Sequence, residues 1–237
     1  MRTIGLLGGM SWQSTAIYYR LLNERVAERV GGDASADLVL RSVDFAEIHR
    51  LQIEGEWHAA GELLAAAARG VEAAGAEVLG LATNTMHLVA GQITAATTIP
   101  FVHIVDAVAE AAGSFGARRL ALLGTGFTMR STLYQDRLAG RGVEILVPSP
   151  AAREVVDRVM FDELVHGVIT PAARAAYVEV VDTLARDGAE AVVLGCTEIG
   201  LLLRPQDVDL PLIDTASVHV DALLAASLST PALEVVA

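Results

Sequence analysis

The chain has 237 residues, of which 53% are hydrophobic, and a formal net charge of −12. This apolar content is enough for one large or two small domains. No apolar run reaches the roughly 18 residues of a membrane span, and no basic stripe follows a predicted helix, so neither a membrane nor a nucleic acid is an expected partner.

Two residue counts restrict the chemistry. The chain contains no lysine, because all 17 of its Lys and Arg residues are arginine, so it cannot hold pyridoxal phosphate as an internal Schiff base. Its one cysteine, Cys196, excludes an internal disulfide and is typical of a reducing compartment. The N-terminus enters an apolar strand pattern rather than a signal-peptide pattern, and we expect a cytoplasmic protein.

Short β-branched or leucine-rich runs alternate with alanine-rich stretches of helical period. In chain order, strands are predicted over Thr3–Gly8 and Val78–Ala82, followed by helices over Thr15–Val30 and Met86–Thr94 respectively. Buried strands that alternate with helices predict an α/β fold of parallel sheets with helices on both faces.

Later helices carry clearer boundary signals. Thr170 is predicted to cap a helix with Pro171 in its first turn, ending near Asp187 before Gly188. A last helix is predicted over about Ser217–Leu228.

The sequence repeats itself weakly but in order. The matching segments are Arg2–Gly8 with Arg118–Gly124, Ala74–Val78 with Asp187–Ala191, and Ile99–Ile104 with Leu210–Asp214. Thr83 and Cys196 lie 113 positions apart, as do Ala76 and Ala189. We therefore predict two pseudo-symmetric Rossmann-like halves: a first lobe of residues 1–97 plus 205–237 and a second lobe of residues 98–204, with the last helix packing back on the first half.

Four polar turns follow predicted strands and precede predicted helices. They are Gly8–Trp12, Thr83–Thr85, Gly124–Thr128 and Cys196–Glu198. Ligands of open parallel sheets bind beyond the carboxyl ends of the strands, and the free N–H groups of a helix N-terminus favour an anion. The sequence therefore predicts a site for a carboxylate ligand in a cleft between the two halves.

Cys196 is the strongest candidate for chemistry. A thiol has an ordinary pKa near ~8.5, which helix N-terminal amides lower, so Cys196 is predicted to act as an acid or base near neutral pH. The alternative is that a lone cysteine serves as a small buried hydrophobic residue.

The equivalent positions of Thr83 and Cys196 favour proton transfer on two faces of one carbon, as inversion requires. A hydrolase would need a histidine beside its nucleophile. None of the six histidines follows a recognisable triad motif, although His87 follows Thr83 closely and stays open as a partner. A dinucleotide has little support, because Gly5–Gly9 does not read G-x-G-x-x-G.

Five motifs in order resemble the aspartate/glutamate racemase family. They are Gly8–Trp12, Ser42–Phe45, Thr83–His87, Leu122–Thr125 and Gly195–Gly200. The resemblance runs from the first strand to about residue 225. It is closest to the bacterial broad-specificity amino-acid racemase subgroup, which also carries threonine at the first catalytic position.

The resemblance implies a cofactor-free racemase or epimerase with no metal, commonly a homodimer, in which two cysteines exchange the α-proton of an amino acid. Cys196 matches the second of these, and Thr83 stands where the first is expected. The residues implied to touch the substrate are Met10, Ser11, Gln52, Asn84, Thr85, Thr125 and Thr197. For Asn84 and Thr85, helix capping is the alternative role.

Thr83 departs from the two-cysteine pattern. A threonine hydroxyl is a far weaker acid than a thiol, so it donates a proton to a carbanion more readily than it abstracts one. We therefore expect turnover that is asymmetric, faster or exclusive from one enantiomer.

Side-chain specificity stays open among aspartate, glutamate and neutral amino acids. His166, Arg50 and Arg153 are candidates for a cationic clamp on a second carboxylate. Two alternatives also stay open: a single-cysteine decarboxylase of the same superfamily, and an amino-acid-binding protein without turnover.

Overall fold

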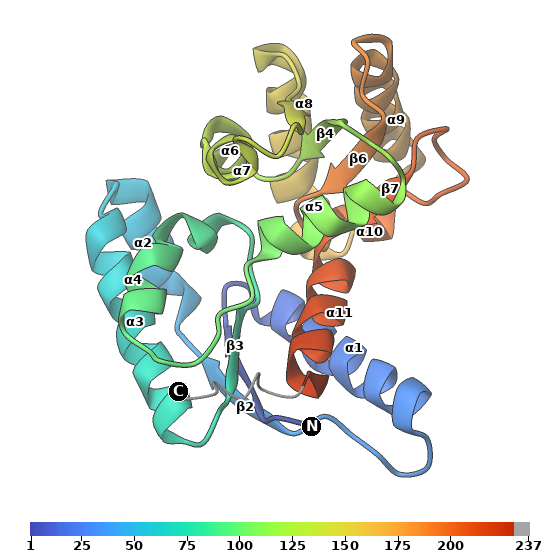
Figure 1. Cartoon of the computed structure of the whole chain (residues 1–237). Coiled ribbons are helices and arrows are strands. Elements are labelled where there is room, and N and C mark those ends of the chain that lie inside the picture. Colours follow the sequence, from blue (N-terminus) through green and yellow to red (C-terminus); the bar gives the residue numbers. More distant parts are fainter. Residues whose placement is uncertain (230–237) are drawn as a thin grey trace. The chain divides into compact units, whose positions relative to one another are not determined.

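The computed structural model describes residues 1–229, which form two units (Figure 1). Unit 1 contains residues 1–82, 89–102 and 220–229, and unit 2 contains Thr83–Leu88 and His103–His219. Within residues 1–229, no helix is both long and apolar enough to cross a membrane.

Unit 1 is built on a parallel sheet with the strand order β2-β1-β3. The strands are β1 (Ile4–Gly8), β2 (Leu38–Ser42) and β3 (Val78–Leu81). Phe101 adds a parallel bridge to Leu79 at the β3 edge. The helices of this unit are α1 (Trp12–Val30), α2 (Phe45–Glu54), α3 (Trp57–Ala73) and α4 (Ala90–Ala95).

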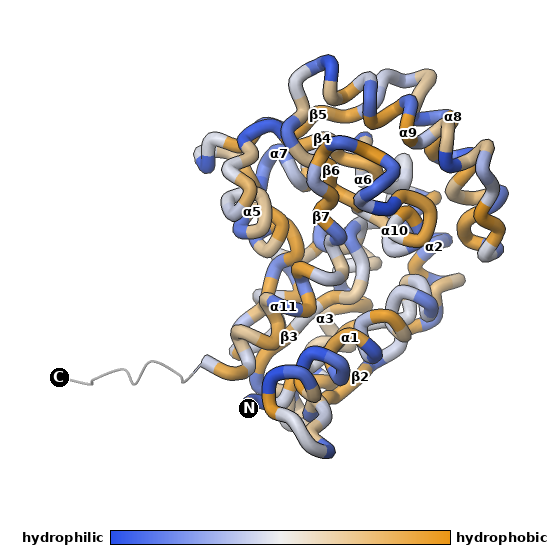
Figure 2. Tube along the Cα trace, turned by 90° about the vertical axis from the view of Figure 1, so that its right-hand side faces the viewer, coloured by the Kyte–Doolittle hydropathy of each residue, from blue (hydrophilic) through white to orange (hydrophobic). Residues whose placement is uncertain are grey.

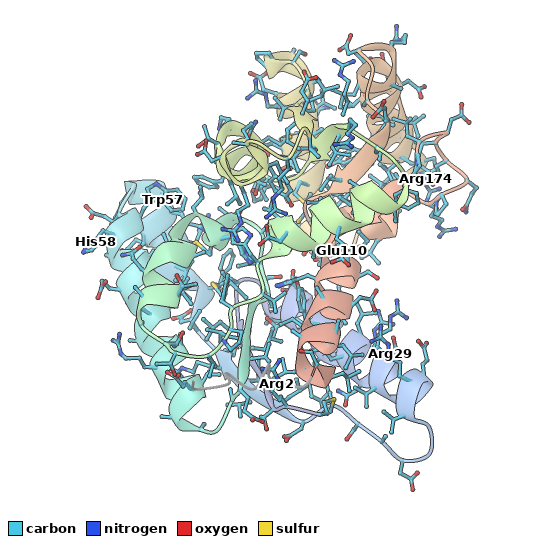
Figure 3. All side chains as sticks on the ribbon, in the orientation of Figure 1. Arg2, Arg29, Trp57, His58, Glu110 and Arg174 are labelled. Atoms are coloured by element: carbon cyan, nitrogen blue, oxygen red, sulfur yellow. The ribbon has the colours of Figure 1, made fainter. Side chains whose placement is uncertain are left out.

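Unit 2 is built on a parallel sheet with the strand order β5-β4-β6-β7. The strands are β4 (Arg119–Leu123), β5 (Glu144–Leu146), β6 (Ala191–Leu194) and β7 (Leu212–Asp214). The helices are α5 (Ile104–Ser114), α6 (Gly126–Arg130), α7 (Leu133–Leu138), α8 (Pro150–Asp162), α9 (Pro171–Arg186) and α10 (Ile199–Leu202), with the short 3-10 helices η1 (Thr85–Val89) and η2 (Leu164–His166). Arg174, labelled in Figure 3, ties α9 to α10 through a 2.9 Å bond from its Nε to the Leu202 carbonyl.

Alternate residues of β4 and β6 face two separate apolar clusters, one on each side of the sheet. Ala121, Leu123, Val192 and Leu194 pack with residues of α8, α9 and α10, whereas Leu120, Leu122, Ala191 and Val193 pack with residues of α5 and α7. Apolar residues accordingly follow these strands, while the helices carry mixed colours (Figure 2). The predicted α/β fold of parallel sheets with helices on both faces is confirmed.

The predicted internal repeat is confirmed in the strand register. Both sheets place their first strand between the second and third, and the pairs Ile4–Val78 and Leu120–Ala191 occupy equivalent places in the two registers. In each sheet, a backbone N–H group of the third strand, β3 or β6, also donates to a proline carbonyl in the segment that pairs with it on its other side. Leu79 N donates to Pro100 O at 2.8 Å, and Val192 N donates to Pro211 O at 2.8 Å.

Most predicted boundaries hold, with one change of helix type. Thr170 Oγ1 caps α9 by accepting from Ala173 N at 3.0 Å, and α9 ends at Arg186. In place of the single helix predicted over Met86–Thr94, η1 is followed by α4. The tighter winding begins at Asn84, whose carbonyl accepts from His87 N at 3.0 Å.

The unit boundaries differ from the predicted lobes. Residues 205–219 belong to unit 2 because β7 pairs with β6, and residues 83–88 belong there because their side chains bond to that unit. Residues 98–102 belong to unit 1, where Phe101 bridges Leu79. Residues 230–237 of the predicted first lobe lie outside the described residues.

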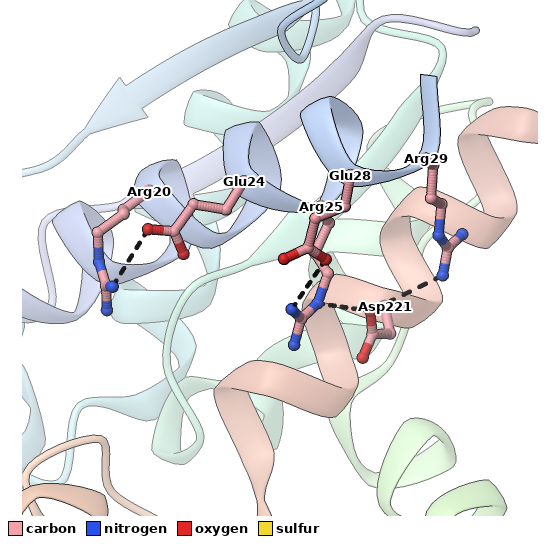
Figure 4. A network of polar contacts seen from close by, with 6 residues as sticks. All are labelled: Arg20, Glu24, Arg25, Glu28, Arg29 and Asp221. Carbon is pink, nitrogen blue, oxygen red and sulfur yellow. Dashed lines mark hydrogen bonds and ion pairs between the residues drawn. The ribbon is translucent and has the colours of Figure 1, made fainter. Parts of the chain in front are cut away.

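The last helix, α11 (Thr215–Leu228), runs from unit 2 into unit 1. Asp221 pairs with Arg25 at 3.2 Å and with Arg29 at 3.8 Å, both on α1 (Figure 4). Leu223 packs so closely on Gly80 that a Cβ there would lie 2.7 Å from the leucine side chain. The end of the last helix packs on the first half, as predicted.

Candidate active site

Two of the four predicted polar turns lie side by side in unit 2 because their strands are paired. β4 runs into Gly124–Thr128 and β6 runs into Cys196–Glu198. Gly195 N donates to Leu123 O at 2.6 Å, and a Cβ on Gly124 would lie 3.5 Å from the Gly195 carbonyl oxygen. The thiol-bearing turn therefore starts in close backbone contact with its neighbour.

A third turn, Thr83–Thr85, is joined to β6 through two side chains. Asn84 Nδ2 donates to Thr215 Oγ1 at 2.9 Å, and Thr215 Oγ1 donates to the Leu194 carbonyl at 2.8 Å. Tyr134 OH donates to Asn84 Oδ1 at 2.6 Å. The Asn84 side chain thus holds the turn in place through bonds within the protein, and its predicted contact with substrate stays a prediction.

Threonine hydroxyls join the same turn to the end of β4. Thr85 Oγ1 lies 3.0 Å from Thr128 Oγ1, which lies 3.3 Å from Thr125 Oγ1. Thr125 also caps α6 by accepting from Thr128 N at 3.4 Å. The predicted contacts of Thr85 and Thr125 with substrate stay predictions, and their hydroxyls have a structural role in the protein.

Thr83 and Cys196 are both partly buried. The Thr83 hydroxyl makes no hydrogen bond to any other residue within 1–229 and is available to a ligand. Cys196 Sγ donates to Glu198 Oε2 at 2.8 Å, and Thr197 Oγ1 donates to the same oxygen at 2.8 Å. Thr197, a predicted substrate contact, is therefore engaged with Glu198.

The predicted lowering of the Cys196 pKa is wrong. Burial of the thiol against the core of unit 2 and the neighbouring Glu198 carboxylate raise its pKa well above the ordinary value. The backbone amides of Thr197 and Glu198 do lower the pKa, as expected at a helix N-terminus, but their effect is smaller. At neutral pH Cys196 is a thiol that can donate a proton.

His87 is not available as a partner for Cys196. Its Nδ1 lies 2.7 Å from the Thr83 carbonyl, and its Nε2 accepts from Ile104 N at 3.2 Å. Since Ile104 N can only donate, Nε2 carries no proton and Nδ1–H donates to Thr83. Burial, with His103 and His219 nearby, lowers the His87 pKa well below its usual value, so the ring is neutral. A thiol–histidine hydrolase pair with His87 is excluded by these bonds.

The expected free N–H groups at the turns are partly occupied by the protein itself. At α6, the Asp157 carboxylate accepts from Gly126 N at 2.7 Å, so this one N–H group is not free. At α1, Ser11 Oγ accepts from Ser14 N at 3.3 Å. Both contacts place an acceptor of the protein where an external anion was expected.

Three predicted substrate residues belong to unit 1. Met10 is buried after β1, Ser11 caps α1, and Gln52 is buried in α2. Of the candidate clamp residues, Arg50 is exposed and paired with Glu54, and Arg153 Nε donates to the Pro148 carbonyl at 2.9 Å. His166 is exposed at the end of η2. The contacts of all these residues with substrate stay predictions.

The sequence reasoning missed the residues that organise these turns. Four residues without a predicted role each form a hydrogen bond to a predicted site residue: Glu198 to Cys196, Thr215 and Tyr134 to Asn84, and Thr128 to Thr85. Glu198 alone carried a usable signal, because a carboxylate two positions after a cysteine in a tight turn can reach its sulfur. The others come from distant parts of the chain.

The fold and these turns define an α/β protein of two repeated parallel-sheet units, with a thiol at the end of one strand and a hydroxyl at its equivalent. Residues 7–223 match the family model described as Asp/Glu/Hydantoin racemase. The chain therefore belongs to the Asp/Glu/hydantoin racemase family, as its motifs suggested.

Individual relatives agree with this membership. The broad specificity amino-acid racemase RacX of Bacillus subtilis (strain 168) is 22% identical over 231 residues, which cover 90% of this chain and 93% of RacX. The crystal structure of a candidate Asp/Glu racemase from Yersinia pestis is 43% identical with a TM-score of 0.92, covering 97% of this chain and 100% of its own. An aspartate racemase homologue from Pyrococcus horikoshii OT3 is 33% identical with a TM-score of 0.87, again over 97% and 100% of the two chains.

Proposed function

We propose that this protein is a cofactor-independent amino-acid racemase that exchanges the α-proton of aspartate, glutamate or a related amino acid. Membership of the racemase family supports the reaction class. The absence of lysine from the sequence supports a mechanism without a pyridoxal phosphate Schiff base. By the same family likeness, we propose a cytoplasmic homodimer.

The observation that carries the proposal is the equivalence of Thr83 and Cys196. Thr83 follows β3 and Cys196 follows β6, each the third strand of its own half. The pairing of β3 with β1 has the same register as the pairing of β6 with β4. The Asn84–Thr215–Leu194 bonds then join the Thr83 turn to the strand that ends at Cys196. Two proton-bearing groups at equivalent ends of a duplicated fold suit a reaction on two faces of one carbon.

The two groups have unequal roles. Cys196 Sγ exchanges a proton with one face of the α-carbon, and the Thr83 hydroxyl serves the other face. A hydroxyl does not ionise usefully near neutral pH, so Thr83 donates readily to the carbanion, and removal of the α-proton by Thr83 in the opposite direction is the harder step. The expected asymmetry between the enantiomers follows from this inequality.

The side chain of the substrate is the less specific part of the proposal. RacX is by its name a broad-specificity enzyme, and the family name includes both acidic amino acids. Arg50 and Arg153, two of the candidate clamp residues, are engaged with Glu54 and Pro148. Acidic and neutral amino acids both belong in the test.

The test uses purified protein without added cofactor in deuterium oxide, with the L and D forms of glutamate and aspartate supplied separately. NMR follows loss of the α-proton and chiral chromatography follows inversion, with Cys196→Ala as the control variant. We expect exchange with inversion that the variant loses. Absence of exchange with all four substrates, and then with neutral amino acids, would reject the racemase.

One observation favours a second candidate, a single-cysteine decarboxylase of the same superfamily. The Cys196 thiol is protonated at neutral pH because burial and Glu198 raise its pKa, and a decarboxylase needs only one thiol to protonate an enediolate. Release of carbon dioxide from a disubstituted malonate, lost in Cys196→Ala, would identify this activity. A protein that binds amino acids without exchange or decarboxylation would be a binding protein only.

A further inference from the structure

We propose that His87 is a positioning residue for Thr83: its ring holds the Thr83 carbonyl and thereby fixes the place of the hydroxyl that serves one face of the substrate. The inference rests on the proposed racemase function and adds to it a residue that acts only through Thr83.

The turn after β3 is held differently at each of its residues. Asn84 and Thr85 bond through their side chains to other elements of unit 2. The Thr83 hydroxyl, in contrast, forms no hydrogen bond to another residue within 1–229. The contact that anchors Thr83 is at its backbone carbonyl, which lies 2.7 Å from His87 Nδ1. The place of the hydroxyl therefore depends on the backbone, and the backbone depends on this bond.

His87 closes the turn with its backbone and its side chain together. Its N–H group donates to the Asn84 carbonyl at 3.0 Å, where η1 begins. Its Nδ1–H group donates to the carbonyl of the preceding residue, Thr83. The side chain thus extends the hydrogen bonds of η1 by one peptide toward β3.

The His87 ring is itself held in one orientation. Only 2% of the residue is exposed, and Nε2 accepts from Ile104 N at 3.2 Å. The rings of His103 and His219 lie nearly edge-on to it, with centroids 4.6 Å and 5.6 Å away. Ile104 N is the first N–H group of α5 and can only donate, so it fixes the tautomer in which Nδ1 carries the proton.

The surroundings keep the ring neutral. Burial, and the neighbouring rings of His103 and His219, lower the His87 pKa well below its usual value. The charged groups that act on His103 are Arg137, Asp106 and Arg141. A neutral ring with both nitrogens engaged carries no proton to a substrate near pH 7. Its contribution to the reaction is therefore the fixed bond to Thr83.

This bond matters because proton transfer requires an exact geometry. A misplacement of about 1 Å can slow an enzymatic reaction on the order of 100-fold. A shift of the Thr83 backbone carries the hydroxyl with it, since no side-chain bond to another residue holds it back. Cys196 lies on a different turn, after β6. Loss of the anchor should therefore slow inversion and leave proton exchange at Cys196 intact.

Two variants separate the two bonds of the ring. His87→Asn places an amide N–H group where Nδ1–H was, so it can keep the bond to Thr83 while Ile104 N loses its acceptor. His87→Gln places an amide oxygen where Nε2 was, so it can keep the bond from Ile104 N while Thr83 loses its donor. Each variant loses one hydrogen bond and the ring, and the two should unfold at similar urea concentrations.

The first measurement needs no substrate. NMR relaxation gives the order parameter of the Thr83 methyl group, whose signal is assigned by its absence in Thr83→Val. We expect the wild-type order parameter in His87→Asn and a lower one in His87→Gln. Equal values in the two variants, or the opposite order, would overturn the positioning role.

The state of the other turn is measured in the same samples. Cys196 is the one cysteine of the chain, so its alkylation by iodoacetamide can be followed by mass spectrometry. We expect the wild-type rate in both variants. A changed rate in His87→Gln would mean that the loss reaches Cys196, and the specific role for Thr83 would be rejected.

The second measurement follows pure L and pure D substrate in deuterium oxide. His87→Gln should lower kcat for inversion about 10- to 100-fold with KM within about twofold of the wild type. Deuterium should still enter, without inversion, the enantiomer whose α-proton Cys196 removes. His87→Asn should keep most of the inversion. Equal inversion in the two variants, or less in His87→Asn, would leave His87 with a structural role only.

The two proposals fail separately. If the wild type exchanges no α-proton with any amino acid tested, the proposed function fails, and the Thr83 order parameter alone decides whether His87 holds the turn. If the wild type inverts its substrate and His87→Gln matches it, His87 is rejected as a positioning residue while the racemase stands.

Discussion

The Asn84 amide donates to the Thr215 hydroxyl at 2.9 Å, and this bond connects residues 131 positions apart in the chain. The Thr215 hydroxyl in turn donates to the carbonyl of Leu194 at 2.8 Å, and Leu194 lies two residues before Cys196. The segment after β3 is thereby held to the strand that carries the thiol, although β3 itself belongs to unit 1. Both ends of the link are polar groups that need a partner when buried.

Thr215→Val should therefore weaken the protein and the proposed reaction together. Valine keeps the shape of threonine but leaves Asn84 Nδ2 and the Leu194 carbonyl without their shared partner, which costs about 1–3 kcal/mol of unfolding free energy. Denaturant unfolding measures the loss, and deuterium exchange at the α-carbon measures activity. The control is Thr183→Val on the exposed side of α9, which should change stability by less than about 0.5 kcal/mol. Equal effects of the two variants would contradict a special role for Thr215.

The buried histidines predict that the protein loses stability as the pH falls. Burial, and Arg137 nearby, lower the His103 pKa to about 4 from 6.5, and burial lowers that of His87. Between these values the unfolded chain binds more protons than the folded one, so stability is complete above pH 6.5 and declines toward pH 4. For His103 the full loss is roughly 3 kcal/mol, at about 1.4 kcal/mol per pKa unit.

Urea unfolding at a series of pH values between 7 and 4 measures this dependence. Val105 N donates to His103 Nδ1 at 3.2 Å, and the side chain in His103→Asn keeps an acceptor for this N–H group. The unfolding free energy of this variant should fall less between pH 7 and pH 4 than that of the wild type, by the contribution of His103. Exposed His49→Gln is the matched control. Parallel curves for wild type and His103→Asn would show that this histidine does not govern acid stability.

The parts of the fold that depend on local pattern could be predicted from the sequence. The alternation of apolar strands with helices predicted the parallel sheets, and Thr170 with Pro171 predicted the start of α9. The internal repeat predicted the equivalent positions of Thr83 and Cys196. Each of these signals lies within a few residues or recurs at a fixed spacing.

The remaining features depend on contacts between distant segments. The lobe boundaries moved because β7 pairs with β6 and because Asn84 and Thr85 bond into unit 2. The Cys196 pKa was predicted in the wrong direction because helix amides can be counted from a sequence, whereas burial and the reach of Glu198 require coordinates. Asp157, which occupies the N-terminus of α6, is 31 positions from Gly126.

Asp157 should stabilise the start of α6, after β4, mainly as a hydrogen-bond acceptor and less through its charge. Its Oδ1 accepts from Gly126 N at 2.7 Å, whereas its ion pair with Arg130 is longer, at 3.5 Å, and involves an exposed arginine. Asp157→Ala should cost about 0.5–2 kcal/mol of stability, as expected for a lost helix cap, and Asp157→Asn less. Thermal or urea unfolding of both variants tests this order. A larger loss in Asp157→Asn would mean that the charge dominates.

Replacement of Thr83 tests the inequality of the two proton-transfer groups. L and D amino acids have equal free energies in water, so a racemase must have the same kcat/KM in both directions. The asymmetry can therefore appear only in the saturated rates, with compensating KM values. We expect unequal kcat values from pure L and pure D substrate in the wild type, and values closer together in Thr83→Cys, where a thiol serves each face.

Thr83→Val is the matched loss-of-function variant, since valine keeps the shape of threonine and the Thr83 hydroxyl bonds to no other residue within 1–229. It should unfold at the same denaturant concentration as the wild type while losing inversion. If Cys196 alone can still remove and return the α-proton, deuterium will enter the substrate without a change of hand. Inversion that survives in Thr83→Val would mean that water or another group protonates the second face, and Thr83 would then have no part in the reaction.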